Sequence, residues 1–472
     1  MLTLTGHDLS VPQLVEAARR PGPVGVHIDA IERMRANRAF VERIAERGDP
    51  VYGLTTGVGV RKTRAIDADA MRDFNRRMVR EHATGQGPSL PPDVVRATAI
   101  LLLNQLAAGR SNVRPEIAEA IAERLTAGID IAVPMYGTTG IGDIQPLSHL
   151  VLALLEGVDL EVGEALPLIG QGSAVTAHAA LALYDAEILL ETLATLIALD
   201  VEAFAANPTP FHPAAGEVRP YPGYRRALAA IGHLLEGTSL AADPRHLHAP
   251  LSFRDAAVVL GAAYDAFSFC LRQVSIELNA HQQNPLALPE EDRMLPVANF
   301  DLQALSAALD FARIALAPCL TVQCERSVKL LQASQTGLTD GLEPPGDAHG
   351  HGLSEMAWPL QALTAEARLL TQPVSAETGS STQAEGIEDR MTMAGLGARR
   401  LAEMTELGFR VAAIGCVFAC QAIDLRGVDR LGDNGRALHD ALRRHVPPLA
   451  PGDPPPADLE PLIASLRSGL LA

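Results

Sequence analysis

The chain has 472 residues, of which 47% are hydrophobic, 20% are charged and only 4% are aromatic. A core built mainly from alanine, leucine and valine favours closely packed helices over sheets. The net charge of −17 is spread along the chain, and such a surface argues against nucleic-acid binding. It leaves room for a small anionic substrate held by one arginine.

The N-terminus has no basic stretch followed by an apolar one, so we expect no signal peptide. No apolar run approaches the roughly 18 residues that span a bilayer, so we expect no membrane association. Cys416 and Cys420 share a helix face, which would suit half a metal site. Small core residues in reducing cytoplasm are the favoured interpretation, so we expect a cytoplasmic protein without a metal.

The first third mixes short helices with loops. Its glycine-dense segments are 51–60 and 134–146, and neither fits a phosphate-binding loop. Between them, residues 94–125 predict a helical pair that is broken near Gly109.

From about residue 173 the pattern predicts long helices over 174–206, 256–278 and 302–331, each apolar almost all round. A helix that is hydrophobic on every side is surrounded by protein, so these helices predict a central bundle. We expect two regions, an N-terminal one over 1–172 and the bundle with C-terminal helices over 173–472.

Six motifs follow one another along the chain. They are Tyr52-Gly53-Leu54-Thr55-Thr56-Gly57-Val58-Gly59, Glu81-His82-Ala83-Thr84-Gly85, Leu251-Ser252-Phe253-Arg254, Glu277-Leu278-Asn279 through Asn284-Pro285-Leu286, Ala298-Asn299-Phe300, and Glu388-Asp389. In this order and spacing, over about residues 2–430, they resemble the histidine and phenylalanine ammonia-lyase family. Leu251 stands where the family has tyrosine, and Gln283 where it has aspartate. The resemblance implies an all-α fold with a central bundle of long helices, and a homotetramer whose active sites each draw on three subunits.

The family makes an electrophilic methylidene-imidazolone (MIO) from an internal Ala-Ser-Gly. Cyclisation joins the glycine nitrogen to the alanine carbonyl, and the serine then loses water. With Asp143 and Pro146-Leu147 as anchors, Gly140-Ile141-Gly142 occupies that place. Because isoleucine has no hydroxyl to expel, we expect this cofactor to be absent.

One alternative remains upstream. Thr138-Thr139-Gly140 would give an ethylidene analogue if the loop shifted by two residues against its anchor. The extra methyl would crowd the electrophilic carbon, so this route is the less favoured one.

The resemblance assigns proton transfer to two residues. Tyr52 matches the tyrosine that removes the β-proton, although an unperturbed pKa of about 10 makes an isolated tyrosine a poor base. Glu388 matches the family's acid/base glutamate. Two alternatives remain open. Tyr52 would be a core residue that caps its glycine loop, and Glu388 would be a helix N-terminal residue that interacts with the helix dipole.

The substrate-binding residues follow in the same way. Arg254 matches the arginine that clamps the substrate carboxylate, with a structural role as the alternative. Gln171, Asn284 and Phe300 would position the ligand and wall the pocket, and Phe300 would equally suit plain packing. Glu81 and His82 match the pair that tunes selectivity, where a carboxylate would favour a polar or basic group. A solvated helix pair is the alternative.

Two further segments are weaker signals. The loop 347–351 holds an H-x-H sequence near an aspartate, but no third metal ligand stands at motif spacing. Residues 377–381 contain the Gly-Ser-Ser that opens a mobile loop in the fumarase/aspartase superfamily, without the lysine and asparagine that follow there.

We therefore expect an MIO-independent enzyme that performs addition–elimination, cyclisation or isomerisation on a small carboxylate-bearing substrate. A non-catalytic binding or scaffold relative is the alternative, and a genuine aromatic amino acid ammonia-lyase is the weakest interpretation.

Overall fold

The computed structural model describes residues 1–66, 68–346, 350–376 and 383–472, and they form two compact units. The first comprises Met1–Tyr184, Leu271–Leu309 and Pro373–Arg399, and the second comprises Asp185–Cys270, Asp310–Gln372 and Arg400–Ala472. The mostly helical fold confirms the predicted class. The division into regions 1–172 and 173–472 stays a prediction.

Four long helices contribute residues to both units. They are α8 (Ser173–Phe204), α12 (Ala256–Asn279), α13 (Gln303–Leu330) and α16 (Ala394–Arg426). The predicted long helices at 174–206, 256–278 and 302–331 are confirmed within a few residues. These helices could be predicted because their apolar side chains lie on every face, and such helices are stable only when protein surrounds them.

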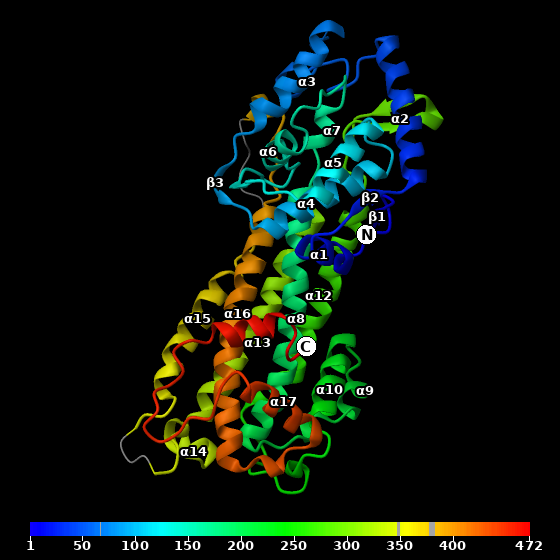
Figure 1. Ribbon diagram of the computed structural model, residues 1–472. Coiled ribbons are helices and arrows are strands. Elements are labelled where there is room, and N and C mark those ends of the chain that lie inside the picture. Colours follow the sequence, from blue (N-terminus) through cyan, green and yellow to red (C-terminus); the bar gives the residue numbers. More distant parts are fainter. Residues whose placement is uncertain (67, 347–349, 377–382) are drawn as a thin grey trace. The chain divides into compact units, whose positions relative to one another are not determined.

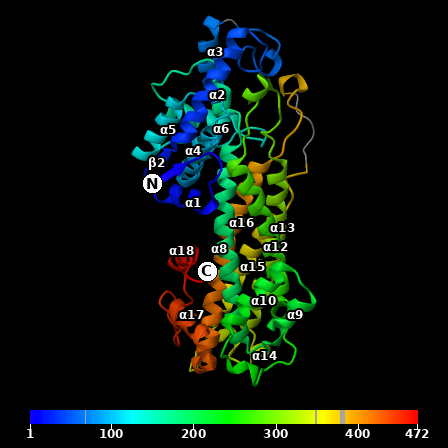
Figure 2. The same ribbon diagram turned by 90° about the vertical axis from the view of Figure 1, so that its right-hand side faces the viewer.

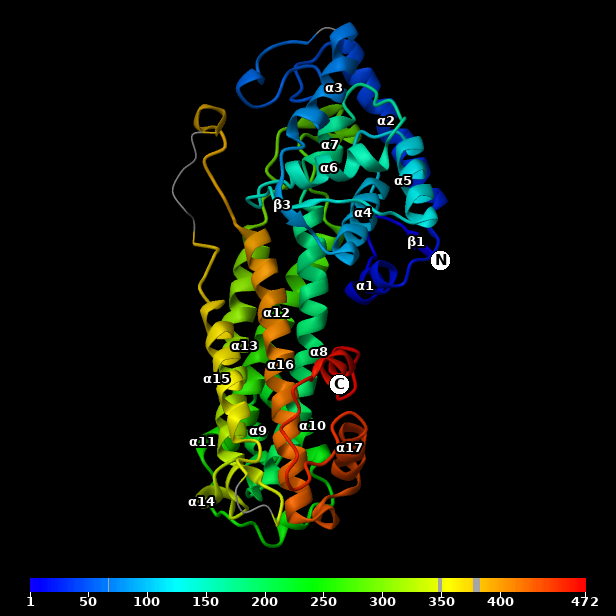
Figure 3. The ribbon, with the colours of Figure 1, turned by 60° about the vertical axis from the view of Figure 1, so that its left-hand side comes forward.

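The first unit is built from short helices around α4. These are α1 (Val11–Arg19), α2 (Ile28–Arg47), α3 (Ala68–His82), α4 (Pro92–Ala107), α5 (Pro115–Ala127), α6 (Ile144–Leu154) and α7 (Ala165–Ile169). Helix α4 is buried from Val94 onward and packs against α1 and α5, while α3 packs against α6 and α7 (Figures 1 and 3). The predicted helical pair over 94–125 corresponds to α4 and α5.

Three small strand pairs complete the first unit. Strands β1 (Leu2–Leu4) and β2 (Val24–Val26) are parallel, with Leu2 opposite Val24. Strands β3 (Gln86–Ser89) and β4 (Pro134–Tyr136) are antiparallel, as are β5 (Leu286–Leu288) and β6 (Arg293–Leu295). The β3–β4 pair holds the end of the Glu81-His82 motif beside the start of the Gly140 loop.

The second unit is a bundle in which α15 (Ala357–Leu369) runs beside its parts of α13 and α16 (Figures 1 and 3). Shorter helices lie around it: α9 (Ala214–Val218), α10 (Pro222–Leu234), α11 (Leu251–Arg254), α14 (Ala333–Thr336), α17 (Asp433–Arg443) and α18 (Glu460–Arg467). Helix α10 packs against α9, which lies beside it in Figure 2, and also contacts α17. Inside the bundle, buried Arg326 donates to Asp200 at 2.8 Å.

Two helices pass the length and composition test for a membrane span among the described residues. Helices α13 and α16 each hold an 18-residue window of mean hydropathy 1.5, so the expectation that no segment approaches this length was wrong. The windows are 61% and 83% buried inside the protein, as is typical of core helices.

Candidate active site

Tyr52 lies in the turn-rich segment that follows α2. Its hydroxyl accepts a hydrogen bond from the Gly59 N–H at 3.0 Å. Burial raises the pKa of Tyr52, the Gly59 bond opposes the rise, and the charge of Glu388 adds to it. The phenol therefore holds its proton throughout the neutral range.

Glu388 reaches Tyr52 from a distant part of the sequence. The one-turn helix η7 (Gln383–Gly386) packs against η1 (Gly59–Arg61), and a Cβ at Gly59 would lie 3.6 Å from the Ala384 Cβ. Ala384 itself has a φ of +49°, a left-handed conformation that is costly for a residue with a side chain. This turn leads directly to half-buried Glu388, so the structure brings the two predicted acid/base residues together.

The loop of Gly140, Ile141 and Gly142 is held by two other segments of the first unit. Ile141 forms an antiparallel bridge with Asp301. The Gly140 carbonyl accepts hydrogen bonds from Thr392 Oγ1 at 2.8 Å and from the Leu302 N–H at 3.3 Å. A backbone carbonyl with two donors is fixed in one orientation.

The residues of this loop do not fit the Ala-Ser-Gly from which the family's prosthetic group is made. Gly140 has a φ of +84°, and a Cβ there would lie 2.1 Å from Thr392 Oγ1. Alanine at 140 would require this backbone to move, because the left-handed region disfavours a Cβ even without a clash. Ile141 supplies no hydroxyl.

Asp143 fastens the loop to the start of α8. The carboxylate is fully buried and accepts bonds from the Val175 N–H at 2.8 Å and from Thr138 Oγ1 at 2.7 Å. Its backbone N–H donates to the Gln171 carbonyl at 2.7 Å. Burial raises the pKa of Asp143 to about 6, against the opposing effect of these bonds. Asp143 therefore fixes the end of the Gly140 loop in place.

Gln171 is fully buried and its amide is bound within the chain. Nε2 donates to the Pro167 carbonyl at 3.1 Å, and Oε1 accepts from the Ser173 hydroxyl at 3.2 Å. The same Pro167 carbonyl accepts from Gln283 Nε2 at 3.0 Å. A ligand bond to Gln171 would therefore share or replace one of these bonds.

Asn284 and Phe300 lie on either side of the β5–β6 pair. Asn284 Oδ1 accepts from the Val297 N–H at 3.0 Å, which leaves its NH2 group as the donor for a ligand. Phe300 is half-buried and precedes Asp301, the bridge partner of Ile141. It therefore lies next in the chain to a residue that contacts the loop, and its role as a pocket wall stays a prediction.

Glu81 and His82 end helix α3. Glu81 is exposed and pairs with Arg77 at 3.1 Å. His82 Nδ1 lies 2.7 Å from the Met78 carbonyl, which can only accept, so Nδ1 carries the proton and Nε2 remains for a ligand. Gly85, at the end of this motif, lies close to Gly137. A Cβ at residue 137 would lie 3.4 Å from the Gly85 Cα. The motif thus borders the start of the loop.

Arg254 belongs to the second unit, whereas Tyr52, Glu388 and the Gly140 loop belong to the first. It ends α11, where its Nε donates to the Ala249 carbonyl at 2.7 Å. The guanidinium is exposed, so its remaining donors are available for a carboxylate.

Thr392 was missed as a site residue. It lies four residues beyond Glu388, donates to Gly140, and receives a hydrogen bond on its own carbonyl from Ser306 at 2.5 Å. Nothing in the local sequence around a single threonine predicts a contact with a loop 252 residues away.

The metal alternatives gain no support from the described residues, where no group of three or more His, Cys, Asp or Glu side chains could hold an ion. Cys416 and Cys420 are buried, and burial raises the pKa of Cys420 to about 12. Asp347 and His349 lie outside the described residues, as does the segment 377–381.

The chain is similar to known proteins over almost its whole length. The chain matches the family model described as aromatic amino acid lyase over residues 9–159 and 154–444. It is 30% identical to a histidine ammonia-lyase of Symbiobacterium thermophilum, over 99% of this chain and 96% of that protein. It is 32% identical to one of Sorangium cellulosum, over 99% and 98%.

Solved structures are similar over the same length. The ergothioneine-degrading enzyme ergothionase of Treponema denticola, in complex with desmethyl-ergothioneine sulfonic acid, has a TM-score of 0.90 at 26% identity, covering 99% of this chain and 98% of that one. Tyrosine aminomutase of Streptomyces globisporus has a TM-score of 0.92 at 28% identity, covering 100% and 97%.

Proposed function

Because the chain belongs to the aromatic amino acid lyase family, we propose that it is a lyase-like enzyme that performs acid/base chemistry without the family's prosthetic group. The reaction would be an addition–elimination, a cyclisation or an isomerisation. Its substrate would be a small carboxylate whose reacting C–H is already acidic, because no electrophile is then needed to activate it.

The observation that carries this proposal is that Glu388 lies close enough for its charge to act on Tyr52, in a chain whose Gly140 loop lacks a serine. Since burial and the charge of Glu388 both raise the pKa of Tyr52, the phenol enters the reaction protonated. Tyr52 would donate its proton to a leaving group or a developing anion, and Glu388 would accept the proton from carbon. The reverse assignment requires a substrate cation near Tyr52 to lower its pKa.

The loop supports the absence of the MIO group by its geometry as well as its sequence. Gly140 is fixed in the left-handed region against Thr392. In the alternative register, the attacking nitrogen would be that of Gly140, which donates to Thr138 Oγ1 at 3.0 Å. Cyclisation there would require this bond to break.

We further propose that the substrate carries a carboxylate for Arg254 and a polar or basic group near His82. Relatives named for histidine and for ergothioneine support a polar substrate, whereas the tyrosine aminomutase shows that aromatic substrates occur in similar structures. His82 Nε2 is the better recognition group of the motif, because Glu81 is already paired with Arg77.

The assembly is part of the same proposal. We propose a cytoplasmic homotetramer in which active sites are shared between subunits, with Arg254 and exposed Leu251 of α11 facing a neighbouring copy. A non-catalytic binding relative is the second candidate. One observation favours it. The side-chain amides of Gln171 and Gln283 already donate hydrogen bonds to the Pro167 carbonyl within the chain.

Kinetics of two variants separate these candidates. Substrates recovered by ligand co-purification would be assayed with Tyr52→Phe, Glu388→Gln and the control Tyr221→Phe, an exposed tyrosine of the second unit. General acid/base catalysis contributes about 10²–10⁴-fold, so each site variant should lose at least about a hundredfold in kcat while the control is unchanged. Turnover that survives both substitutions would contradict the assignment, and binding without turnover by the unaltered protein would favour the non-catalytic relative.

A further inference from the structure

A cavity of about 480 Å³ lies in the first unit, on the side of the Tyr52 segment that faces α2. Its lining comes from α2, the segment 54–66, the start of α3 and the loop at Val162: Arg38, Val41, Glu42, Ala45, Glu46, Gly48, Leu54, Thr55, Ala65, Ile66, Met71 and Val162. This volume falls within the range of about 300–1,000 Å³ typical of small-molecule sites. None of the site residues predicted from the sequence lines it.

The floor of the cavity is formed by buried apolar side chains. Val41 and Leu54 belong to the buried cluster formed with Phe40, Ile44, Val51 and Ala287, against which Ala45 and Val162 pack. Met71 of α3 is 2% exposed. Burial of a ligand's apolar side chain here would favour binding by about 25 cal/mol per Å² of apolar surface removed from water.

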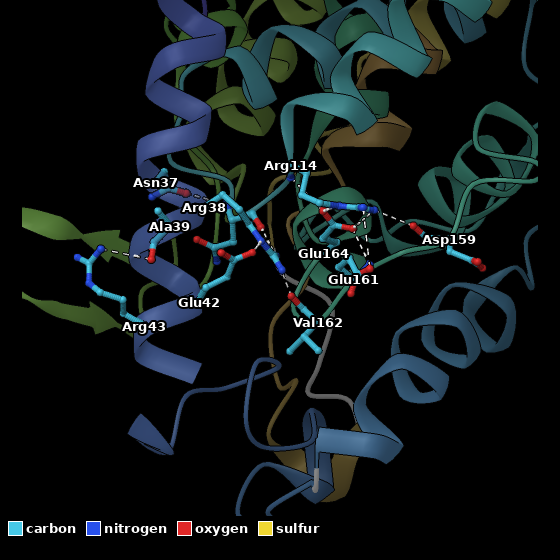
Figure 4. Close-up of polar contacts among 11 residues, drawn as sticks. Asn37, Arg38, Ala39, Glu42, Arg43, Arg114, Asp159, Glu161, Val162 and Glu164 are labelled. Carbon is cyan, nitrogen blue, oxygen red and sulfur yellow. Dashed lines mark hydrogen bonds and ion pairs between the residues drawn. The ribbon is translucent and has the colours of Figure 1, made fainter. Parts of the chain in front are cut away.

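One wall carries a buried cation with a donor to spare. Arg38 is only 8% exposed, and Figure 4 shows its guanidinium between α2 and the Val162 loop. Nε donates to Glu42 at 2.8 Å, and Nη1 donates to the carbonyls of Asn112 at 3.1 Å and Val162 at 2.9 Å. Among the described residues, Nη2 has no hydrogen-bond partner. Nη2 is not among the fully buried atoms that lack a partner, so a ligand carboxylate can reach it and accept a charge-assisted hydrogen bond.

The mouth of the cavity has the opposite charge. Glu42 and Glu46 stand one turn apart on α2, and both are exposed. Glu42 is paired with Arg38, whereas Glu46 has no ion pair with any residue that the structure describes. The cavity therefore offers an apolar floor, an anion-binding donor on a buried wall and an unpaired carboxylate at the rim.

We propose that this cavity binds a free α-amino acid with an apolar side chain. The carboxylate accepts from Arg38 Nη2, the ammonium lies beside Glu46, and the side chain packs on Val41, Leu54 and Met71. A simple carboxylic acid would leave Glu46 unpaired beside its apolar body, and a simple amine would leave Arg38 Nη2 unsatisfied. The zwitterion satisfies both groups.

The occupant would also touch the segment that carries Tyr52. Leu54 and Thr55 line the cavity two and three residues beyond Tyr52, and Ala65 pairs across the same segment with Thr56. A bound amino acid should therefore slow local opening of residues 54–66. This consequence does not depend on what reaction Tyr52 performs.

Titration calorimetry with L-leucine tests the proposal, with 3-methylbutylamine and 4-methylpentanoate as ligands that lack one charged group. Ala45→Phe fills the cavity and should abolish binding, and Glu46→Gln should weaken it about tenfold. Glu32→Gln, an exposed glutamate of α2 outside the lining, and Arg254→Gln, in the proposed substrate clamp, should both bind leucine as the unaltered chain does.

Hydrogen exchange locates the bound amino acid. Leucine should protect residues 38–48 and 54–66 and leave 137–142 unchanged. Three results would overturn the proposal: no leucine binding at millimolar concentration, binding that survives Ala45→Phe but is lost in Arg254→Gln, or either single-charge ligand binding as tightly as leucine.

Discussion

Restoring the family tripeptide is a severe test of the Gly140 loop. In the double variant Gly140→Ala/Ile141→Ser the sequence again reads Ala-Ser-Gly, yet we expect no dehydrated ring to form. A Cβ at 140 would lie 2.1 Å from Thr392 Oγ1, on a backbone with φ of +84°. The left-handed conformation costs about 1–2 kcal/mol for alanine. Displacing Thr392 from the Gly140 carbonyl costs about 1 kcal/mol more.

The double variant should therefore be about 2–3 kcal/mol less stable than the parent in denaturant unfolding. Ile141→Ser alone leaves the contacts of residue 140 unchanged and serves as the control. We expect it to lose less stability than the double variant. Adding Thr392→Ala to the double variant removes the clash and should restore part of the stability. Intact-mass measurement shows whether the dehydrated ring has formed. Loss of two waters from the double variant would show that the loop is not committed to its present conformation, and would refute the reasoning.

Two further predictions concern buried charges of the second unit. Burial raises the pKa of Glu202 to about 7, so its folded pKa exceeds the unfolded value of 4.5. The stability it contributes is fully present below pH 4.5 and is lost as the pH rises through 7. Glu202→Gln should therefore match the parent at pH 4.5 and exceed it by up to about 3 kcal/mol at pH 8.5, measured by urea unfolding; equal stability at both pH values would count against it. Arg326→Met leaves Asp200 buried and unpaired and should cost about 3–5 kcal/mol, against less than about 1 for the exposed control Arg20→Met. A similar small loss for both would show that Asp200 does not depend on the pair.

Much of the fold could be predicted from the sequence, because the patterns that indicate helices and their ends lie in consecutive residues. The helix α8 was predicted from a run of apolar residues on all faces, and the break between α4 and α5 from Gly109, whose φ is +75°. The apolar windows of α13 and α16 were underestimated, because scattered charges obscured stretches that pass the span criterion. Burial, which sequence alone does not give, identifies them as core.

The candidate site was accessible only in part. The motifs located Tyr52 and Glu388, and the structure adds that the charge of one raises the pKa of the other. Glu81 pairs with Arg77 one helical turn before it, a spacing that the sequence does contain, whereas the contact of Thr392 with Gly140 could not be read from the sequence. Such contacts depend on side-chain directions and on segments brought together over long sequence separations.

The mass of the peptide containing residues 137–142, taken from purified protein with demonstrated turnover, tests the central claim most directly. An enzyme that works by proton transfer between Tyr52, Glu388 and substrate should yield this peptide at its encoded mass. A peptide lighter by two waters, with a fragment spectrum that places a closed ring within the segment, would contradict the account.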